Sequence, residues 1–186
     1  MANNKDTIRK EILERLRRQS KEEKRLKSDA VKNRLFSSEM FKKARAVMFY
    51  VSKEEEVDTH RMIDEALRIG KRVAVPYYVS ETSEIKAKEI RDQRLDLELG
   101  PYGIYQPRED ASIGKIPIKE IDLVIVPGVA FDEKNNRLGR GKGCYDRFLR
   151  KLSPGTKTIG LCFDFQIVGN LPKDSSDFLV HKVISN

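Results

Sequence analysis

Residues 121–128 read IDLVIVPG, a run that is apolar on both faces of a strand and ends in Pro-Gly. Strands without a polar face are typical of the middle of a parallel sheet, because helices cover such a sheet on both sides. Further strands are predicted at 45–51, 71–79, 84–90, 157–163 and 177–185, the third of them weakly. Residues 121–128 are therefore expected to form the central strand of the fold.

Helical patterns separate these strands. The second helix is expected to begin at a capping box formed by Ser20 and Glu23, and the last to cover 144–152. The residues with helical spacing, expected to form the inward faces, are Ile8, Ile12, Leu13 and Leu16; Leu26, Ala30 and Leu35; Met62, Ile63, Ala66 and Leu67; and Tyr145, Phe148, Leu149 and Leu152. This alternation predicts an α/β fold: three layers, α/β/α, with a mostly parallel, Rossmann-like central sheet preceded by N-terminal helices.

The composition predicts a globular protein with one domain over residues 1–186, because 35% of the residues are charged and the chain has the length of a single domain. No apolar run approaches the ~20 residues that a membrane helix needs, and no secretory signal is recognised. Cys144 and Cys162 are not in CxxC spacing. Two reduced thiols are expected, which favours a cytoplasmic location.

The net charge of +8 is concentrated in the first 45 residues, which hold 15 Lys and Arg against 7 Asp and Glu. A basic helical region of this kind binds nucleic acid, binds an anionic ligand, or is simply a solvated surface. No RNA-binding or zinc-finger motif accompanies it. The main expectation is therefore that the protein has no nucleic-acid or membrane partner. Nucleic-acid binding is kept as an alternative function.

The segment PGVAFDEKNNRLGRGKG, residues 127–143, connects the central strand to the last helix. Ligands of open α/β sheets bind at the carboxyl ends of the strands, which is where this segment begins. Gly139, Gly141 and Gly143 allow backbone amides to converge on an anion. The nearby cations Arg137, Arg140 and Lys142 add charge-assisted donors. This combination favours a cradle for a polyphosphate.

Familiar phosphate loops do not match this segment. A Walker A motif needs glycine where Asn136 stands and a hydroxyl residue where Gly143 stands. A GxGxxG loop needs glycine where the chain has Cys144. From the residues alone, a glycine-rich turn with solvated cations therefore remains an open alternative.

Several acidic residues are candidates for the same site. Asp146 lies in the first turn after the glycines, and Asp177 precedes the last predicted strand; each is either a Mg²⁺ ligand or a cap residue. Asp146→Ala is expected to weaken Mg²⁺ dependence more than folding. The acidic triplet 54–56 follows a predicted strand, and one of its members is a candidate to hold the NH groups of a polar ring. His60 and His181 are isolated, so no zinc site is predicted.

The segment PGVAFDEKNNRLGRGKGCYDRFL, residues 127–149, resembles the signature of the 5-formyltetrahydrofolate cyclo-ligase family, a PG-(L/V)-(A/G)-F-D segment followed by R-L-G-x-G-x-G-Y-Y-D. Residues 5–17, 49–76 and 159–185 are similar to the N-terminal helix, the substrate-binding strand with its helix, and the C-terminal end of that family. The chain departs from the pattern at Cys144, where tyrosine is usual, and at Ser176, where histidine is frequent. A Met-x-Phe segment found in many members is not evident.

The resemblance implies that ATP and Mg²⁺ drive the conversion of 5-formyltetrahydrofolate to 5,10-methenyltetrahydrofolate. The formyl oxygen attacks the γ-phosphate, N10 attacks the resulting iminium phosphate, and ADP and phosphate are released. Small-molecule substrates and a monomer are expected. A relative that binds folate or nucleotide without cyclo-ligase activity is the second alternative.

The resemblance also implies roles for individual residues. The ATP-binding positions are Lys5, Arg9, Arg137, Leu138, Gly139, Arg140, Gly141, Lys142, Gly143, Cys144 and Tyr145. The folate-binding positions are Val51, Glu56, Arg140, Gly141, Lys142, Gly143 and Cys144. Asp146 and Asp177 match the Mg²⁺ ligands, and Arg140 and Lys142 are the catalytic candidates that stabilise transition-state charge.

Overall fold

A computed structural model describes residues 4–79, 82, 84–100, 103–108, 114–174 and 177–186. Its central feature is a six-stranded sheet in the order β11-β9-β6-β1-β2-β3. The strands are β1 (Ala46–Met48), β2 (Arg72–Val79), β3 (Glu84–Ile90), β6 (Leu123–Val126), β9 (Lys157–Leu161) and β11 (Lys182–Ile184). All neighbours pair in parallel except β2 and β3, which are antiparallel. The sheet confirms the predicted α/β class and the internal position of β6.

Helices cover both faces of this sheet, and the alternation of side chains along the strands explains why. Val47, Leu123 and Ile125 point into the larger core. That core also receives the buried faces of α1 (Lys5–Arg18), α2 (Lys21–Ser37), α3 (Glu39–Lys43) and α4 (His60–Arg68). Val124 and Val126 point the other way and pack with Phe148 and Leu149 of α6 (Cys144–Leu149). The structure is therefore a three-layer α/β/α arrangement with most of its helices on one face.

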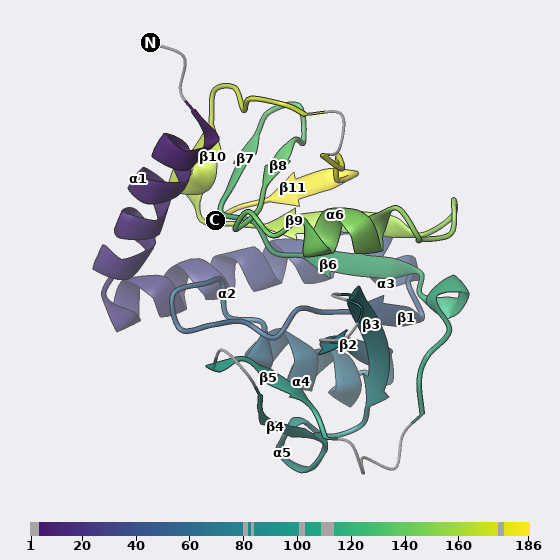
Figure 1. The fold of residues 1–186 in the computed structure, drawn as a ribbon. Helices are drawn as coiled ribbons and strands as arrows, with labels where there is room; N and C mark the ends of the chain where they lie inside the picture. The colour runs from purple at the N-terminus through teal and green to yellow at the C-terminus, as the bar shows by residue number, and fades with distance from the viewer. Residues whose placement is uncertain (1–3, 80–81, 83, 101–102, 109–113, 175–176) are drawn as a thin grey trace.

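Two smaller sheets complete the fold. One has the order β10-β7-β8, with β7 at Ala130–Asp132, β8 at Arg137–Leu138 and β10 at Ile167–Val168. The other pairs β4 (Leu97–Leu99) with β5 (Tyr105–Pro107) after the short helix α5 (Gln93–Asp96). Two 3-10 turns lie at Ile118–Glu120 and Asp164–Gln166. Figure 1 shows α1 standing beside β10 and β7, so that the first helix reaches the segment between β6 and α6.

Three sequence predictions need correction. Leu26 is 56% exposed, because the inward face of α2 follows Ser28, Val31 and Leu35 instead. The last helix ends at Leu149 rather than at 152. The last strand begins at Lys182 rather than at 177. The chain before it forms a loop, in which the Val180 amide donates to the carbonyl oxygen of Asn135.

Among the described helices, none combines the length and the apolar character that crossing a bilayer requires.

Asp132 organises the turn that leads to the glycines. Its buried carboxylate accepts hydrogen bonds from the backbone amides of Lys134, Asn136 and Leu171 and from the Asn136 side chain. Burial acts to raise the pKa of Asp132, but the hydrogen bonds from Asn136 and the backbone amides outweigh it and lower the pKa below its usual value. Asn135 adopts a left-handed conformation with φ of 62° inside this turn.

Stability is expected to depend on pH through Asp132. Because the pKa of Asp132 is lower in the folded state, its stabilisation is present above the unfolded pKa of about 4 and is lost as the pH falls through the folded pKa. Asp132→Asn is expected to cost about 1–3 kcal/mol near pH 7 and much less at low pH. Urea unfolding between pH 3 and pH 7 measures this, with the exposed neighbour Glu133→Gln as the control. A pH-independent difference between Asp132→Asn and the unaltered protein would contradict it.

Candidate functional site

The segment between β6 and α6 is partly a hairpin rather than an open loop. Arg137 and Leu138 form β8, which pairs antiparallel with β7, and the glycines follow directly. Gly141 and Gly143 have φ values of 103° and 63°, which glycine adopts without steric cost, and Gly143 caps α6. Gly139 is required for a different reason: a Cβ there would lie 2.9 Å from Nη1 of Arg137. The backbone of the glycine segment therefore lies directly on this guanidinium.

Arg137 is buried under the glycine segment. Its side chain is only 3% exposed, and Nη2 donates to Oδ1 of Asp146 at 2.7 Å. Nη1 donates to the carbonyl oxygen of Pro127 at 3.2 Å, and the guanidinium carbon lies 5.9 Å from the centre of the Tyr145 ring. Arg140 and Lys142, by contrast, are exposed. The three cations of the segment thus divide into one internal and two external side chains.

The structure brings the two predicted metal ligands together. Oδ1 of Asp146 accepts the backbone amide of Phe178 at 3.3 Å, which places Asp146 beside Asp177. Burial acts to raise the pKa of Asp177, but the Asp174 amide, the Lys5 ammonium and the nearby Arg137 charge lower it overall. Asp177 is therefore held as a carboxylate.

Helix α1 supplies two cations to this place. Nζ of Lys5 lies 2.6 Å from Oδ2 of Asp177 and 2.6 Å from Oδ2 of Asp174. Nε of Arg9 donates to the carbonyl oxygen of Gly139 at 2.9 Å. Of the two N-terminal cations that the resemblance assigns to ATP, Arg9 thus contacts the glycine segment from 130 residues away, and Lys5 contacts the predicted metal ligand Asp177 from 172 residues away.

Arg140 joins the glycine segment to the loop after β1. Its Nη2 lies 3.3 Å from Oε1 of Glu55 and 3.0 Å from Oε1 of Glu56. The second oxygen of Glu56 accepts the amide of Lys53 at 3.0 Å. Burial acts to raise the pKa of Glu55, but its own backbone amide and Arg140 lower it overall. A predicted catalytic cation and a predicted folate-binding acid therefore form an ion pair.

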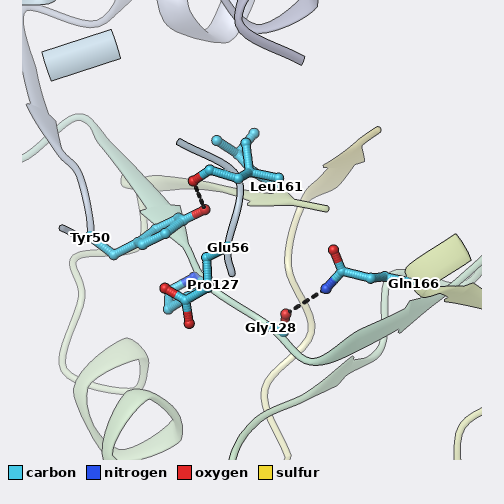
Figure 2. A pocket seen from close by; sticks show the side chains of 7 residues that line it. Tyr50, Glu56, Pro127, Gly128, Leu161 and Gln166 are labelled. Carbon is cyan, nitrogen blue, oxygen red and sulfur yellow. Dashed lines mark hydrogen bonds between the residues drawn. The ribbon is translucent and has the colours of Figure 1, made fainter. Parts of the chain in front are cut away.

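Beneath this ion pair, the carboxyl ends of β1, β6 and β9 border a small cavity of about 10 Å³. Its lining residues are Tyr50, Glu56, Val57, Pro127, Gly128, Leu161 and Gln166. Figure 2 shows Glu56 and Pro127 among the lining residues, and the Gln166 amide joined to the carbonyl oxygen of Gly128, a hydrogen bond of 3.0 Å. The Tyr50 hydroxyl donates to the carbonyl oxygen of Val57, and burial raises the pKa of Tyr50 well above its usual value.

The remaining predicted positions differ in their burial and in their contacts. Val51 and Leu138 are buried in the larger core. The Cys144 thiol is half-buried, and Arg147 donates to its sulfur at 3.5 Å. Tyr145 is half-buried with its ring edge-to-face on Phe148. Val51 and Leu138 therefore have packing roles that the motif did not indicate, whereas the packing of Tyr145 on Phe148 agrees with its helical spacing.

The pair of aspartates suits a magnesium ion better than it suits a metal that needs three or more protein ligands. In the described part of the chain, no group of three or more His, Cys, Asp or Glu side chains is arranged to hold a metal. Mg²⁺ normally takes one or two carboxylates and completes its shell with phosphates and water. Oδ2 of Asp146 and Oδ1 of Asp177 accept no hydrogen bond from the described residues, so each carboxylate keeps one oxygen for a ligand.

Some residues of the site escaped the sequence analysis. Asp174 binds Lys5, and no sequence pattern marked it. Gln166 lines the cavity and donates to two carbonyl oxygens, those of Gly128 and Val129, again without a local signal. Glu55 had a signal, because it belongs to the acidic triplet, but its contact with Arg140 spans 85 residues of chain. Contacts between distant segments explain all three omissions.

Comparison with known proteins finds relatives of this chain among enzymes of one kind. Curated relatives include a probable 5-formyltetrahydrofolate cyclo-ligase of Caenorhabditis elegans, 32% identical over 89% of this chain and 84% of the relative. The mouse 5-formyltetrahydrofolate cyclo-ligase is 28% identical over 95% of this chain and 91% of the relative.

Solved structures agree with these relatives. The 5,10-methenyltetrahydrofolate synthetase of Aquifex aeolicus superposes with a TM-score of 0.84 at 32% identity, covering 97% of this chain and 88% of that one. The Mycoplasma pneumoniae synthetase gives a TM-score of 0.76 at 25% identity, with 98% of each chain covered. The family model of the 5-formyltetrahydrofolate cyclo-ligases matches residues 1–186, which confirms the resemblance found in the motif. The chain therefore belongs to the 5-formyltetrahydrofolate cyclo-ligase family.

Proposed function

We propose that the protein converts 5-formyltetrahydrofolate to 5,10-methenyltetrahydrofolate at the expense of ATP. The observation that carries this proposal is the position of the glycine segment between two sets of side chains. Arg9 contacts Gly139, Asp146 pairs with Arg137 and Glu56 pairs with Arg140, while Lys5 pairs with Asp177. One segment thus contacts both a phosphate-compatible region and a region suited to a polar heterocycle.

The chemistry requires a good leaving group on the formyl carbon. An amide oxygen leaves poorly as hydroxide and well as phosphate, so the formyl oxygen attacks the γ-phosphorus of ATP and ADP departs. N10 then attacks the iminium carbon, loses its proton, and phosphate leaves with the original formyl oxygen. Positioning and charge stabilisation carry such a reaction, and a strong general base is not needed.

The residues divide these tasks by their positions. Lys142 and Arg140 project outward from the glycine segment and stabilise charge on the transferred phosphoryl group. Lys5 and Arg9 hold the nucleotide from α1. Asp146 and Asp177 would hold Mg²⁺, which would supply positive charge beside the phosphate oxygens of ATP.

Folate binding requires Arg140 to leave Glu56. The cavity of about 10 Å³ at Glu56 is far smaller than the roughly 300–1,000 Å³ that ligand sites of this kind occupy. Glu56 can accept the NH groups of a pterin ring only when its ion pair with Arg140 opens. The released Arg140 then carries its charge to the phosphoryl group, which links occupation of the two substrate sites.

Three further properties belong to the proposal. The protein acts as a monomer with one domain over residues 1–186, because the glycine segment and both sets of side chains come from one chain. It acts in the cytoplasm, in keeping with free thiols at Cys144 and Cys162. Small molecules are its partners, since cations of the basic region such as Arg25 and Lys27 are paired with Glu22 and Glu23.

Incubation of the purified protein with 5-formyltetrahydrofolate and Mg-ATP is expected to produce the near-ultraviolet absorbance of the methenyl product. ADP and phosphate are expected in equal amounts with that product. Omission of ATP is the control for spontaneous cyclisation. No ATP-dependent absorbance, with nucleotide binding intact, would contradict the proposal and favour a relative that binds nucleotide without cyclo-ligase activity.

A further inference from the structure

A second hollow lies between the end of α2 and the strand β11. This open groove has a volume of about 460 Å³, and small-molecule sites occupy roughly 300–1,000 Å³. It is bordered by Arg34 and two serines at the end of α2 and by residues 182–185 of β11 and its continuation. It shares none of these residues with the small cavity at Glu56 or with the glycine segment. The groove is therefore a different place from the proposed substrate site.

Two cations, one from each wall, border this groove. Arg34 comes from α2, and Lys182 comes from β11. Side chains alternate along a strand, so Lys182 shares a face with Ile184, which is buried in the core that also receives α2. Among the described residues that line the groove, Arg34 and Lys182 are the only charged ones. The groove is therefore positively charged.

Arg34 and Lys182 differ from nearby cations in their partners. On α3, Lys42 and Lys43 lie 3.4 Å and 3.9 Å from oxygens of Glu39. In the part of the chain that the structure describes, neither Arg34 nor Lys182 has a carboxylate oxygen at such a distance. Nη1 of Arg34 donates to the carbonyl oxygen of Ser185 at 2.9 Å, which holds the side chain at the groove and leaves Nη2 and Nε for another acceptor. The two charges are thus available to an anion.

The number and type of these charges favour a phosphate ester. A phosphate monoester carries a charge of about −1.5 to −2 at pH 7, which two cations match. The guanidinium of Arg34 suits the oxygens of a phosphate in a two-pronged contact, while the Lys182 ammonium acts as a compact charge. Val183 and Ile184 supply the apolar part of the lining, which suits the remainder of such a ligand.

Addition of a peptide strand to β11 is less favourable than binding of a small molecule. The strand β11 has only three residues, Lys182–Ile184. Beyond its end, the carbonyl oxygen of Ser185 already accepts a hydrogen bond from Arg34. An extended peptide would therefore find few backbone partners along this edge.

We infer that the groove between α2 and β11 is a second binding site, which takes a small molecule bearing a phosphate ester. Arg34 and Lys182 are its main contacts. The inference does not depend on the proposed function, because no residue of the proposed mechanism lines the groove. Occupation of the groove is therefore expected to be compatible with nucleotide bound at the glycine segment.

Titration of the isotope-labelled protein with ribose 5-phosphate, followed through its backbone amide resonances, tests the inference. Saturable shifts are expected at residues 34–38 and 182–185. Arg34→Gln and Lys182→Gln are each expected to raise the Kd of this site about tenfold, because each removes a hydrogen bond to a charged group. The control is Lys43→Gln, which removes the same charge from a side chain that is 80% exposed on α3, and its Kd is expected to stay within about twofold.

Four results would overturn the inference. Shifts confined to residues 137–143 would show that phosphate binds only at the glycine segment. Shifts that do not saturate, or an equal weakening in Lys43→Gln, would show a general attraction to positive charge. Tighter binding of succinate than of ribose 5-phosphate would contradict the phosphate class of the ligand.

Failure of the proposed function is a separate result, since it appears as absent methenyl formation whatever happens at the groove. Arg34→Gln and Lys182→Gln are expected to leave the rate of methenyl formation unchanged. Both side chains are exposed, so the variants are expected to fold, and the same spectra identify folded protein. Because each variant tests the site by itself, either one decides the matter.

Discussion

Lys142→Ala is expected to lower kcat by about 10²-fold or more while the melting temperature changes little. The side chain is exposed between Gly141 and Gly143, both of which hold left-handed backbone conformations. We propose that this exposed ammonium meets the transferred phosphoryl group. Removal of one group that stabilises developing charge typically costs 10²–10³-fold in kcat. Steady-state rates of methenyl formation and a thermal melt measure the two effects separately.

Lys134→Ala provides the matched control for Lys142→Ala. Lys134 is also exposed and lies in the same connection between β6 and α6. Its substitution by alanine removes the same charge from the protein as Lys142→Ala does. Its only hydrogen bond to Asp132 is made by the backbone amide, which alanine retains. A near-normal kcat in Lys142→Ala, or an equal loss in both variants, would remove Lys142 from the proposed mechanism.

Asp146→Ala is expected to destabilise the protein by about 3 kcal/mol, which for a chain of this length lowers the melting temperature by roughly 10 °C. The physical reason is the ion pair with Arg137, whose side chain is 3% exposed. Deletion of Asp146 leaves this guanidinium buried beside the carbonyl oxygen of Pro127, with no carboxylate of the described residues within 4 Å. The sequence alone predicts a larger effect on Mg²⁺ dependence than on folding, and the buried ion pair adds a stability cost that the sequence did not indicate.

Urea unfolding of Asp146→Ala measures this loss. Asp174→Ala is the matched control, because Asp174 is also paired with a cation but its side chain is 68% exposed. Exposed ion pairs contribute at most about 1 kcal/mol. Asp146→Asn retains an acceptor for Arg137 and is therefore the better variant for testing metal binding. Equal stability of Asp146→Ala and the unaltered protein would show that the Arg137 charge is compensated in another way.

The local features of this protein follow from the sequence. The run 121–128 predicted a strand inside a parallel sheet, and β6 occupies that position with both faces buried. The three glycines of the motif permit left-handed backbone, and Gly141 and Gly143 adopt it while Gly139 does not. These predictions succeed because side-chain periodicity and glycine conformation depend on residues a few positions apart. The family, too, is recognisable from the continuous motif at 127–149.

The division of labour within the motif depends on contacts between distant segments. Arg137, Arg140 and Lys142 are equivalent cations when the sequence is read alone, yet the pairing of β8 with β7 turns Arg137 inward. The partners of these cations and acids lie far away in the chain: Arg140 meets Glu56 across 84 residues, and Lys5 meets Asp177 across 172. Strand order and the packing of α1 bring such partners together. Whether a charge is buried, paired or exposed is a property of that packing, and no local pattern of residues encodes it.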